Sequence, residues 1–228
     1  MDPAAPVITI DGPSGTGKGT VALWLKNTLG WHLLDSGSLY RVVGLAATRG
    51  DISLENSETV AAIARSLDLE FIESNGEIRV ILAGEDVSEA IRSEECGAAA
   101  SRVAAVPEVR EALLQRQHEF QQFPGLVADG RDMGTVVFPS AALKIFLTAS
   151  AEERAQRRYK QLKQKGMGVN LARLLGDITA RDKRDQERSV SPLKPASDAV
   201  ILDTTDASIG IVEDKVRRLV ADRGLWPG

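Results

Sequence analysis

The sequence predicts an α/β fold in which helices flank a mostly parallel β-sheet. Three observations lead to this prediction. Apolar, β-branched segments alternate with helical patterns along most of the chain, as parallel strands with crossover helices require. The first such segment, Val7–Asp11, leads into a glycine-rich loop and then a helix. With 228 residues, the chain is long enough for one domain of this class.

The loop after the first strand has the form of a phosphate-binding loop. Residues 12–20 are GPSGTGKGT and meet the pattern Gly-x4-Gly-Lys at Lys18. Glycines let backbone N–H groups approach an anion, and the positive end of the helix predicted over Lys18–Leu29 points to the same place. The residue after the lysine is Gly19, so the hydroxyl that normally binds Mg²⁺ is displaced to Thr20. The motif predicts a nucleoside triphosphate ligand.

The next part of the chain departs from simple alternation. A short apolar run over 31–34 precedes a helix that starts within 35–38 and ends at Arg49, and a second helix is predicted over Glu55–Leu67. Two β-rich runs then flank Asn75-Gly76, a pair typical of hairpin turns. Since a hairpin is foreign to an alternating α/β chain, we expect residues 57–96 to form an inserted antiparallel subdomain.

The second half of the chain returns to alternating strands and helices. Strands buried in the core are predicted over 125–129, 143–147 and 199–202. Helices are predicted over 97–105, 107–121, 150–165, 170–188 and 208–223. Ser150 is in the N-cap position of one of them, with Glu153 completing a capping box. In such sheets ligands bind at the carboxyl ends of the strands, so the loops there are the candidate site.

Composition excludes several classes of protein. The chain is 43% hydrophobic and 26% charged, which is typical of a globular domain, and it has no apolar run long enough to cross a bilayer. A single cysteine, Cys96, excludes an internal disulfide and is expected to be a small packed residue. With no leader-like segment before the first strand, these features predict a cytoplasmic protein. The net charge of −4 argues against general nucleic-acid binding.

Charge is nevertheless uneven along the chain. Between Glu152 and Arg188 there are eleven Lys and Arg against six Asp and Glu. A basic segment in an acidic protein indicates a local anionic ligand. The alternative is a solvated helix face with i,i+4 ion pairs such as Arg173 with Asp177.

Polar residues gather at four places that follow predicted strands or face them. These are the phosphate loop, residues 35–41, residues 129–132, and the helical set Arg181, Asp185 and Arg188, with Arg154, Arg157 and Arg158 one helix earlier. Phosphoryl transfer explains these residues, because the protein has to align the two reactants and neutralise their negative charge rather than form covalent bonds with them. Arginine binds phosphate bidentately and stays charged. The alternative is local ion pairing, in a tight turn at 129–132 and along the helix predicted over 170–188.

Together these stretches resemble the bacterial-type cytidylate kinases, within the nucleoside monophosphate kinases. The resemblance runs from about Pro6 to Arg223, and ADGRDMGTVVFP at 128–139 and the long insertion are its most specific parts. It implies a P-loop NTPase fold of three α/β/α layers, with a small antiparallel insertion and a short helical lid. One kinase domain would comprise a core at about 6–35, 100–150 and 190–225, a monophosphate-binding region at about 36–99, and a lid at about 152–168.

The resemblance implies transfer of the ATP γ-phosphate to CMP or dCMP, giving ADP and CDP or dCDP, with Mg²⁺ as cofactor. ATP would be bound by Gly12, Pro13, Ser14, Gly15, Thr16, Gly17, Lys18, Gly19, Thr20, Arg157 and Arg158. CMP would be bound by Ser36, Tyr40, Arg41, Ser101, Arg110, Arg131, Asp132, Arg181, Asp185 and Arg188. Catalysis would rest on Lys18, Asp129, Arg131 and Arg181, and Thr20 is the candidate contact to Mg²⁺.

Within that set the resemblance also implies separate roles. The acceptor phosphate would be held by Arg41, Arg131 and Arg181, the sugar hydroxyls by Asp185 with Arg181, and the base by Ser101, Arg110 and Asp132, with Arg188 as support. An acid that accepts from the cytosine amine and an arginine that donates to N3 and O2 would reject uracil, which reverses the hydrogen-bonding pattern at two positions and leaves buried groups unpaired. No general base is needed for an ionised phosphate acceptor, and neither histidine, His32 or His118, lies in a catalytic motif.

Other functions remain open at this stage. The nearest alternative is a kinase for UMP or AMP. A GTP-dependent switch is disfavoured because the chain has no Asn-Lys-x-Asp element, and a nucleic-acid-binding module is disfavoured by the acidic net charge. We expect a monomer that binds ATP, CMP and dCMP, and neither nucleic acid nor a membrane.

Overall fold

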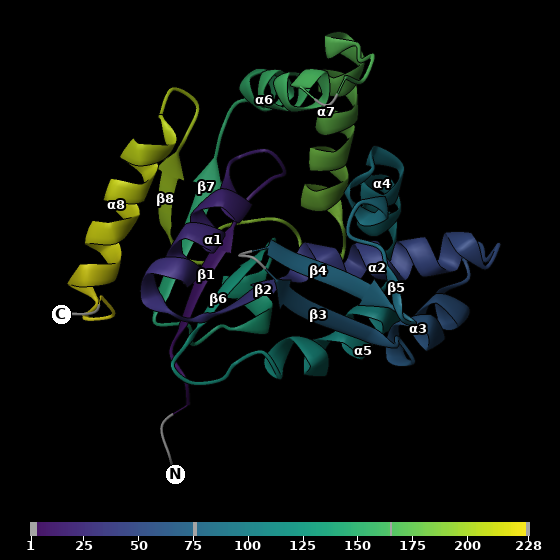
Figure 1. Ribbon diagram of the computed structural model, residues 1–228, viewed down its shortest axis with the longest axis horizontal. Coiled ribbons are helices and arrows are strands. Elements are labelled where there is room, and N and C mark those ends of the chain that lie inside the picture. The colour runs from purple at the N-terminus through teal and green to yellow at the C-terminus, as the bar shows by residue number, and fades with distance from the viewer. Residues whose placement is uncertain (1–3, 75–76, 165, 227–228) are drawn as a thin grey trace. The chain divides into compact units, whose positions relative to one another are not determined.

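The structure is a computed structural model that describes residues 4–74, 77–164 and 166–226 (Figure 1). The chain divides into two compact units. The first unit comprises Met1–Asp35 and Gln117–Gly228, and the second comprises Ser36–Arg116. The second unit therefore begins where the predicted monophosphate-binding region begins and continues beyond residue 99.

The first unit is built on a parallel sheet of five strands. In sheet order these are β2 (His32–Asp35), β6 (Leu126–Gly130), β1 (Val7–Asp11), β7 (Leu143–Thr148) and β8 (Val200–Asp203) (Figure 1). The central strand β1 is buried along its whole length and pairs with β6 on one side and β7 on the other. The phosphate loop therefore leaves the middle of the sheet, with the loops after β6 and β7 on either side.

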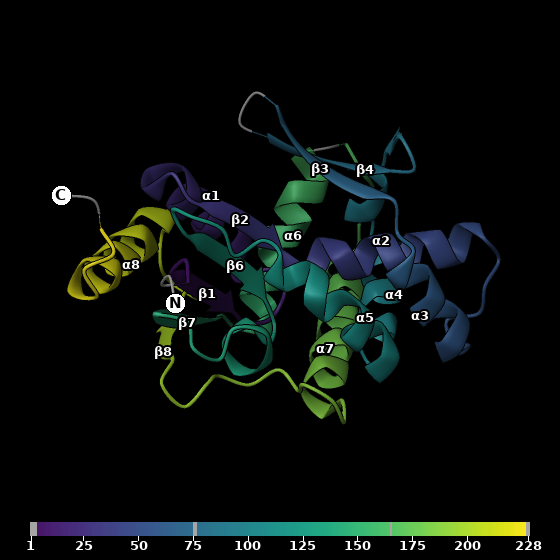
Figure 2. The same ribbon diagram turned by 90° about the horizontal axis from the view of Figure 1, so that it is seen from below.

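Four helices belong to the first unit: α1 (Lys18–Leu29), α6 (Ala151–Gln164), α7 (Leu171–Glu187) and α8 (Ile209–Asp222). Helices α1 and α8 contact each other beside the sheet (Figure 2). Their apolar side chains are buried against it. The core formed there consists of Ile8, Ile10, Val21, Ala22, Leu25, Trp31, Val127, Leu143, Ile145, Leu147, Val212, Val216 and Val220. The predicted α/β fold with a parallel central sheet and flanking helices is confirmed.

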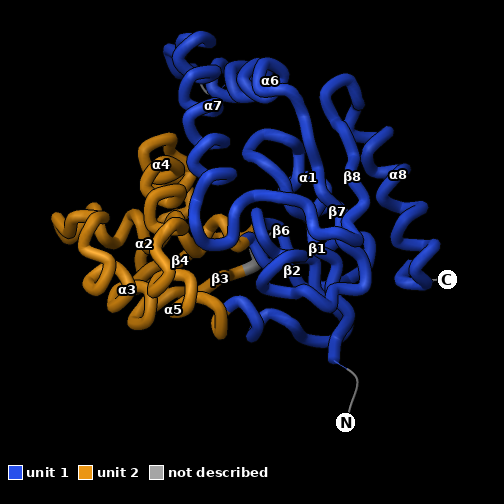
Figure 3. The backbone as a smooth tube through the Cα atoms, turned by 180° about the vertical axis from the view of Figure 1, so that it is seen from behind, with its two compact units in different colours: residues 1–35, 117–228 blue, residues 36–116 orange. Residues whose placement is uncertain are grey.

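The second unit, orange in Figure 3, holds a small antiparallel sheet and helices. Its elements are α2 (Ser36–Arg49), α3 (Ser57–Arg65), β3 (Leu69–Ser74), β4 (Glu77–Leu82), β5 (Glu85–Asp86), the short 3-10 turn η1 (Ala90–Arg92), α4 (Glu94–Val103) and α5 (Pro107–His118), which ends at the unit's boundary. Strands β3, β4 and β5 pair antiparallel, which confirms the predicted inserted sheet. The Asn75-Gly76 turn lies outside the described residues.

Several element boundaries differ from the sequence predictions, each for a local reason. Helix α4 begins at Glu94, three residues early, because the Ser93 hydroxyl accepts a hydrogen bond from the backbone N–H of Cys96 (3.1 Å). The loop expected after β6 contains a π-helical turn, η2 (Met133–Val137). The strand expected in the core near 199–202 is β8, an edge strand whose Ile201 is 57% exposed. Within the described residues, no helix combines the length and apolar composition of a membrane span.

Candidate active site

The phosphate loop is shaped by glycines and closed by its own side chains. Gly12 has φ +144°, and a Cβ there would lie 2.1 Å from the carbonyl oxygen of Leu147, so only glycine lets the chain leave β1 in this direction. The Thr16 hydroxyl donates to the carbonyl of Pro13 (3.1 Å), and the Lys18 ammonium donates to the same oxygen (2.8 Å). Among the described residues, no side chain caps the first turn of α1. The loop therefore presents backbone donors to an anion.

Lys18 is buried at the start of α1, at the carboxyl edge of the sheet. Burial lowers its pKa from 10.5 to about 7, and the nearby guanidinium groups of Arg131 and Arg181 add to this effect. Asp129 acts in the opposite direction. Burial disfavours the charged form of Lys18 even with Asp129 nearby, so a bound anion such as a polyphosphate would stabilise the ammonium.

Asp129 lies at the end of β6, beside the first turn of α1. It pairs in register with Ile10 of β1 and Asp35 of β2, and a Cβ on Gly19 would be 3.6 Å from its carboxylate. Burial raises its pKa from 3.8 to about 6, and the Asp35 carboxylate adds to this rise. Lys18 and Arg131 partly oppose it. Two acids thus share this corner of the sheet with the buried lysine.

Arginines from two separate segments meet at one carboxylate. The Arg131 Nε donates to Asp185 Oδ2 (3.3 Å), and the Arg181 Nε lies 4.0 Å from the same oxygen. Asp185 is buried on α7, while Arg131 follows β6. Two of the groups singled out in the sequence, residues 129–132 and the α7 set, therefore come together in the first unit.

Asp132 and Arg188 form a second buried pair nearby. The Arg188 Nη2 lies 3.9 Å from Asp132 Oδ1, and the two side chains are 4% and 3% exposed. The Arg188 Nε also donates to the carbonyl of Ser191 (2.5 Å), which anchors the end of α7 to the following loop. The partly buried Arg157 of α6 donates to the carbonyl of Thr204 (2.5 Å).

Asp11 is a site residue that the sequence reasoning missed. Its two carboxylate oxygens each accept a backbone N–H, from Met133 and from Gly134, both at 2.8 Å. This holds the turn η2, which directly follows Asp132, against β1. Burial raises the pKa of Asp11 from 3.8 to about 7 despite the two N–H donors. The available signal was an acidic residue ending a fully apolar strand directly before the phosphate loop.

The second unit holds the other residues predicted to bind CMP. The Arg110 guanidinium stacks 5.7 Å from the centre of the Tyr40 ring and donates to the carbonyl of Ala104 (3.3 Å). Ser36, Tyr40 and Ser101 are buried on α2 and α4. Arg41 makes a contact that the sequence did not indicate, since its guanidinium donates to the carbonyls of Ile91 (2.5 Å) and Ser93 (3.2 Å). Its predicted role at the acceptor phosphate stays a prediction.

The remaining polar candidates have structural contacts. His32 Nε2 lies 2.9 Å from the carbonyl of Phe123, and His118 Nε2 lies 2.8 Å from that of Val137. Cys96 is buried and its thiol donates to the carbonyl of Arg41 (3.2 Å). In the part of the chain that the structure describes, no group of three or more His, Cys, Asp or Glu residues is placed to hold a metal ion.

Comparison with known proteins agrees with this geometry. The family model for cytidylate kinase matches residues 8–222. A cytidylate kinase from Pseudomonas fluorescens is 59% identical over 227 residues, covering 99% of both chains. Those from Shewanella denitrificans and Colwellia psychrerythraea are 58% and 59% identical, each covering 95% of this chain and 96% of the relative. The phosphate loop and the two arginines at Asp185 agree with this match. The chain belongs to the cytidylate kinase family, the ATP-dependent phosphotransferases that act on CMP and dCMP.

Proposed function

We propose that the chain performs its family's reaction at the carboxyl edge of the parallel sheet, with ATP as donor and CMP or dCMP as acceptor. The observation that carries this proposal is the buried cationic group around Lys18, Arg131 and Arg181, next to a preformed phosphate loop. Two anionic nucleotides repel each other, and a site that brings them together must supply positive charge in advance. The depressed pKa of Lys18 fits a site built for an anion.

The chemical step needs little beyond alignment and charge. A phosphate oxygen of CMP attacks the γ-phosphorus of ATP in line, the bond to the bridging oxygen breaks, and ADP leaves. Lys18, Arg131 and Arg181 stabilise the charge that spreads over the transferring group. The acceptor phosphate is ionised near neutral pH, so no side chain has to remove a proton. This agrees with the purely structural contacts of both histidines.

The acids beside the phosphate loop fit the Mg²⁺ that accompanies ATP. Mg²⁺ prefers oxygen ligands and usually takes one or two carboxylates together with phosphates and water. Asp129 and Asp35 offer carboxylates at adjacent strand ends, and Thr20 adds a hydroxyl on the first turn of α1. These residues would hold the ion, which supplies charge neutralisation on the donor phosphates when it is bound.

Base selection is assigned to buried polar groups. Asp132 accepts from the cytosine amine, with Arg188 as its neighbour in the first unit. Arg110 and Ser101 of the second unit stay predicted contacts to the remaining edge of the base. Uracil presents an acceptor where cytosine presents a donor, so it would offer the buried Asp132 carboxylate no hydrogen bond, which is an unfavourable mismatch.

A panel of acceptors tests the proposal directly. ADP release is measured with ATP and Mg²⁺ and with CMP, dCMP, UMP, AMP or GMP at equal concentrations. We expect kcat/KM for CMP and dCMP to exceed the values for the other acceptors by at least about 100-fold, as expected for a site built to hydrogen-bond one base edge. A preference for UMP or AMP would overturn the assignment in favour of another monophosphate kinase.

A further inference from the structure

Arg154 is a buried arginine that does not belong to the predicted substrate contacts. It lies on α6, and its side chain is 4% exposed. Its guanidinium makes a two-pronged ion pair with Asp182 of α7, with Nη1 to Oδ1 at 3.1 Å and Nη2 to Oδ2 at 2.5 Å. Parallel N–H···O bonds of this kind fix the relative orientation of the two groups as well as their distance.

The same guanidinium reaches two further segments. Its Nε donates to the carbonyl of Ala149, just after β7 (3.0 Å), and its Nη1 also donates to the carbonyl of Ser14 in the phosphate loop (3.2 Å). The loop packs directly on this side chain, since a Cβ on Gly15 would lie 3.1 Å from the Cβ of Arg154. One side chain therefore joins the phosphate loop, the end of a core strand and α7.

The position of Asp182 on α7 explains how this link affects the site. Asp182 is the direct neighbour of Arg181, and Asp185 follows three residues later. An ion pair that fixes Asp182 fixes the rotation of α7 about its own axis, and with it the direction of Arg181 and Asp185. Any movement of the phosphate loop at Ser14 acts on the same guanidinium.

We propose that Arg154 and Asp182 are positioning residues that couple the phosphate loop to α7, so that the donor phosphates and Arg181 are held in a fixed relation. The proposal rests on the proposed function for the roles of the loop and of Arg181. Neither Arg154 nor Asp182 needs to touch a substrate. Loss of the ion pair between Arg154 and Asp182 leaves the binding groups in place but disturbs their alignment. It therefore lowers the rate of the chemical step more than it weakens binding.

Steady-state kinetics with a matched control test this coupling. Asp182→Asn keeps the side-chain shape and removes the charge. We expect it to lower kcat by about tenfold or more, while KM for ATP and for CMP changes less than about threefold. Asp177→Asn is the control, because Asp177 lies on the same helix in an exposed pair with Arg173 (3.9 Å) and should leave both constants unchanged. Arg154→Lys should retain more turnover than Arg154→Ala.

Hydrogen exchange provides a readout that does not depend on the acceptor. ADP should slow amide exchange both in the phosphate loop and in residues 178–187 of the wild-type chain. In Asp182→Asn we expect ADP to protect the loop alone. Equal protection of α7 in both proteins, or a kcat for folded Asp182→Asn within twofold of wild type, would overturn the coupling. If no monophosphate is phosphorylated the proposed function fails, and the exchange experiment still decides this inference.

Discussion

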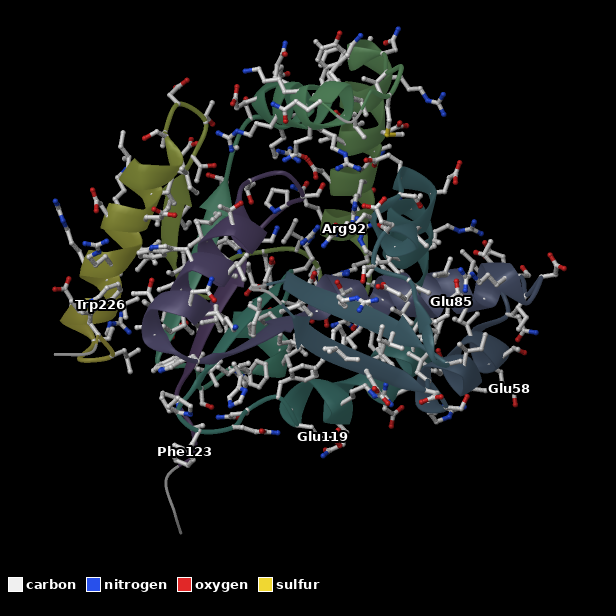
Figure 4. All side chains as sticks on the ribbon, in the orientation of Figure 1. Glu58, Glu85, Arg92, Glu119, Phe123 and Trp226 are labelled. Atoms are coloured by element: carbon white, nitrogen blue, oxygen red, sulfur yellow. The ribbon has the colours of Figure 1, made fainter. Side chains whose placement is uncertain are left out.

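The charged residues at the carboxyl edge of the parallel sheet and the ion pair between Arg49 of α2 and Glu85 of β5 both combine basic with acidic side chains, but they lie in opposite environments. Lys18 and Asp129 are buried, and their pKa values move to about 7 and about 6. On the second unit, Arg49 and Glu85 form a two-pronged pair at 2.7 and 2.9 Å, yet their side chains are 43% and 60% exposed. Glu85 of this pair is labelled in Figure 4. Distance alone therefore does not separate these two groups of charges, whereas burial does.

The difference teaches how the site is prepared. An exposed ion pair exchanges water for a partner at little net gain. A buried group has given up its water and stays charged only if neighbours or a ligand repay the cost. At the sheet edge, burial and the guanidinium groups of Arg131 and Arg181 disfavour the charged form of Lys18, and Asp129 favours it. A bound phosphate would stabilise that charged form. Substitutions in the two regions should therefore differ greatly in effect.

The largest effect is expected from Lys18→Ala. Loss of the buried ammonium removes charge stabilisation from the transferring phosphoryl group, and we expect kcat to fall by about 100- to 1000-fold. The unfolding temperature should change far less, because the variant also removes a buried charge. Stopped-assay turnover and a thermal melt measure the two quantities. Lys215→Ala, an exposed lysine on α8, is the control, and wild-type turnover in Lys18→Ala would refute the role.

Asp132→Ala should have the next largest effect, on selectivity rather than on rate. A hydrogen bond to a charged acceptor is worth about 1.5–3 kcal/mol, so the ratio of kcat/KM for CMP to that for UMP should fall about 10- to 100-fold. KM for ATP should remain near the wild-type value. The measurement is the acceptor panel repeated on the variant, with Asp177→Ala as control. An unchanged ratio would show that Asp132 does not select the base.

The buried acid Asp11 predicts a pH dependence of stability. Its pKa is raised by burial to about 7, against 3.8 unfolded, so between pH 4 and 7 the folded chain keeps a proton that the unfolded chain releases. The free energy of unfolding contributed by this group is therefore highest below pH 4, falls as pH rises to about 7 and is flat above that. Asp11→Asn lacks this titration.

Denaturant titrations of the two proteins from pH 4 to 8 measure that contribution. Wild-type stability minus that of Asp11→Asn should decline with rising pH by an amount on the order of a few kcal/mol at most, and then level off. Parallel curves for the two proteins would contradict the raised pKa of Asp11.

Local signals explain which features were predictable from the sequence. The strand Val7–Asp11, the phosphate loop and α1 were predicted because their determinants lie within about twenty residues, in β-branched runs, glycines and a following helical pattern. The family resemblance added candidate residues from distant segments. The contact of Asp11 with Met133 joins residues 122 positions apart, and the bond from Arg154 to Ser14 joins residues 140 apart. Asp11 directly precedes the phosphate loop and Arg154 lies in a cluster of arginines, but the local pattern does not indicate the distant partner of either residue.

The smallest effect is expected at the exposed pair of the second unit, and it completes the comparison. Arg49→Ala removes one partner of a well-aligned pair, but both side chains keep their water, and salt screens what attraction remains. We expect the unfolding temperature and kcat/KM for CMP to stay within experimental error of wild type at physiological ionic strength. The double variant Arg49→Glu with Glu85→Arg should behave likewise. A marked loss of activity in Arg49→Ala would mean that an exposed charge contributes to the reaction. The exposed fraction of a side chain would then not indicate which charges contribute to activity.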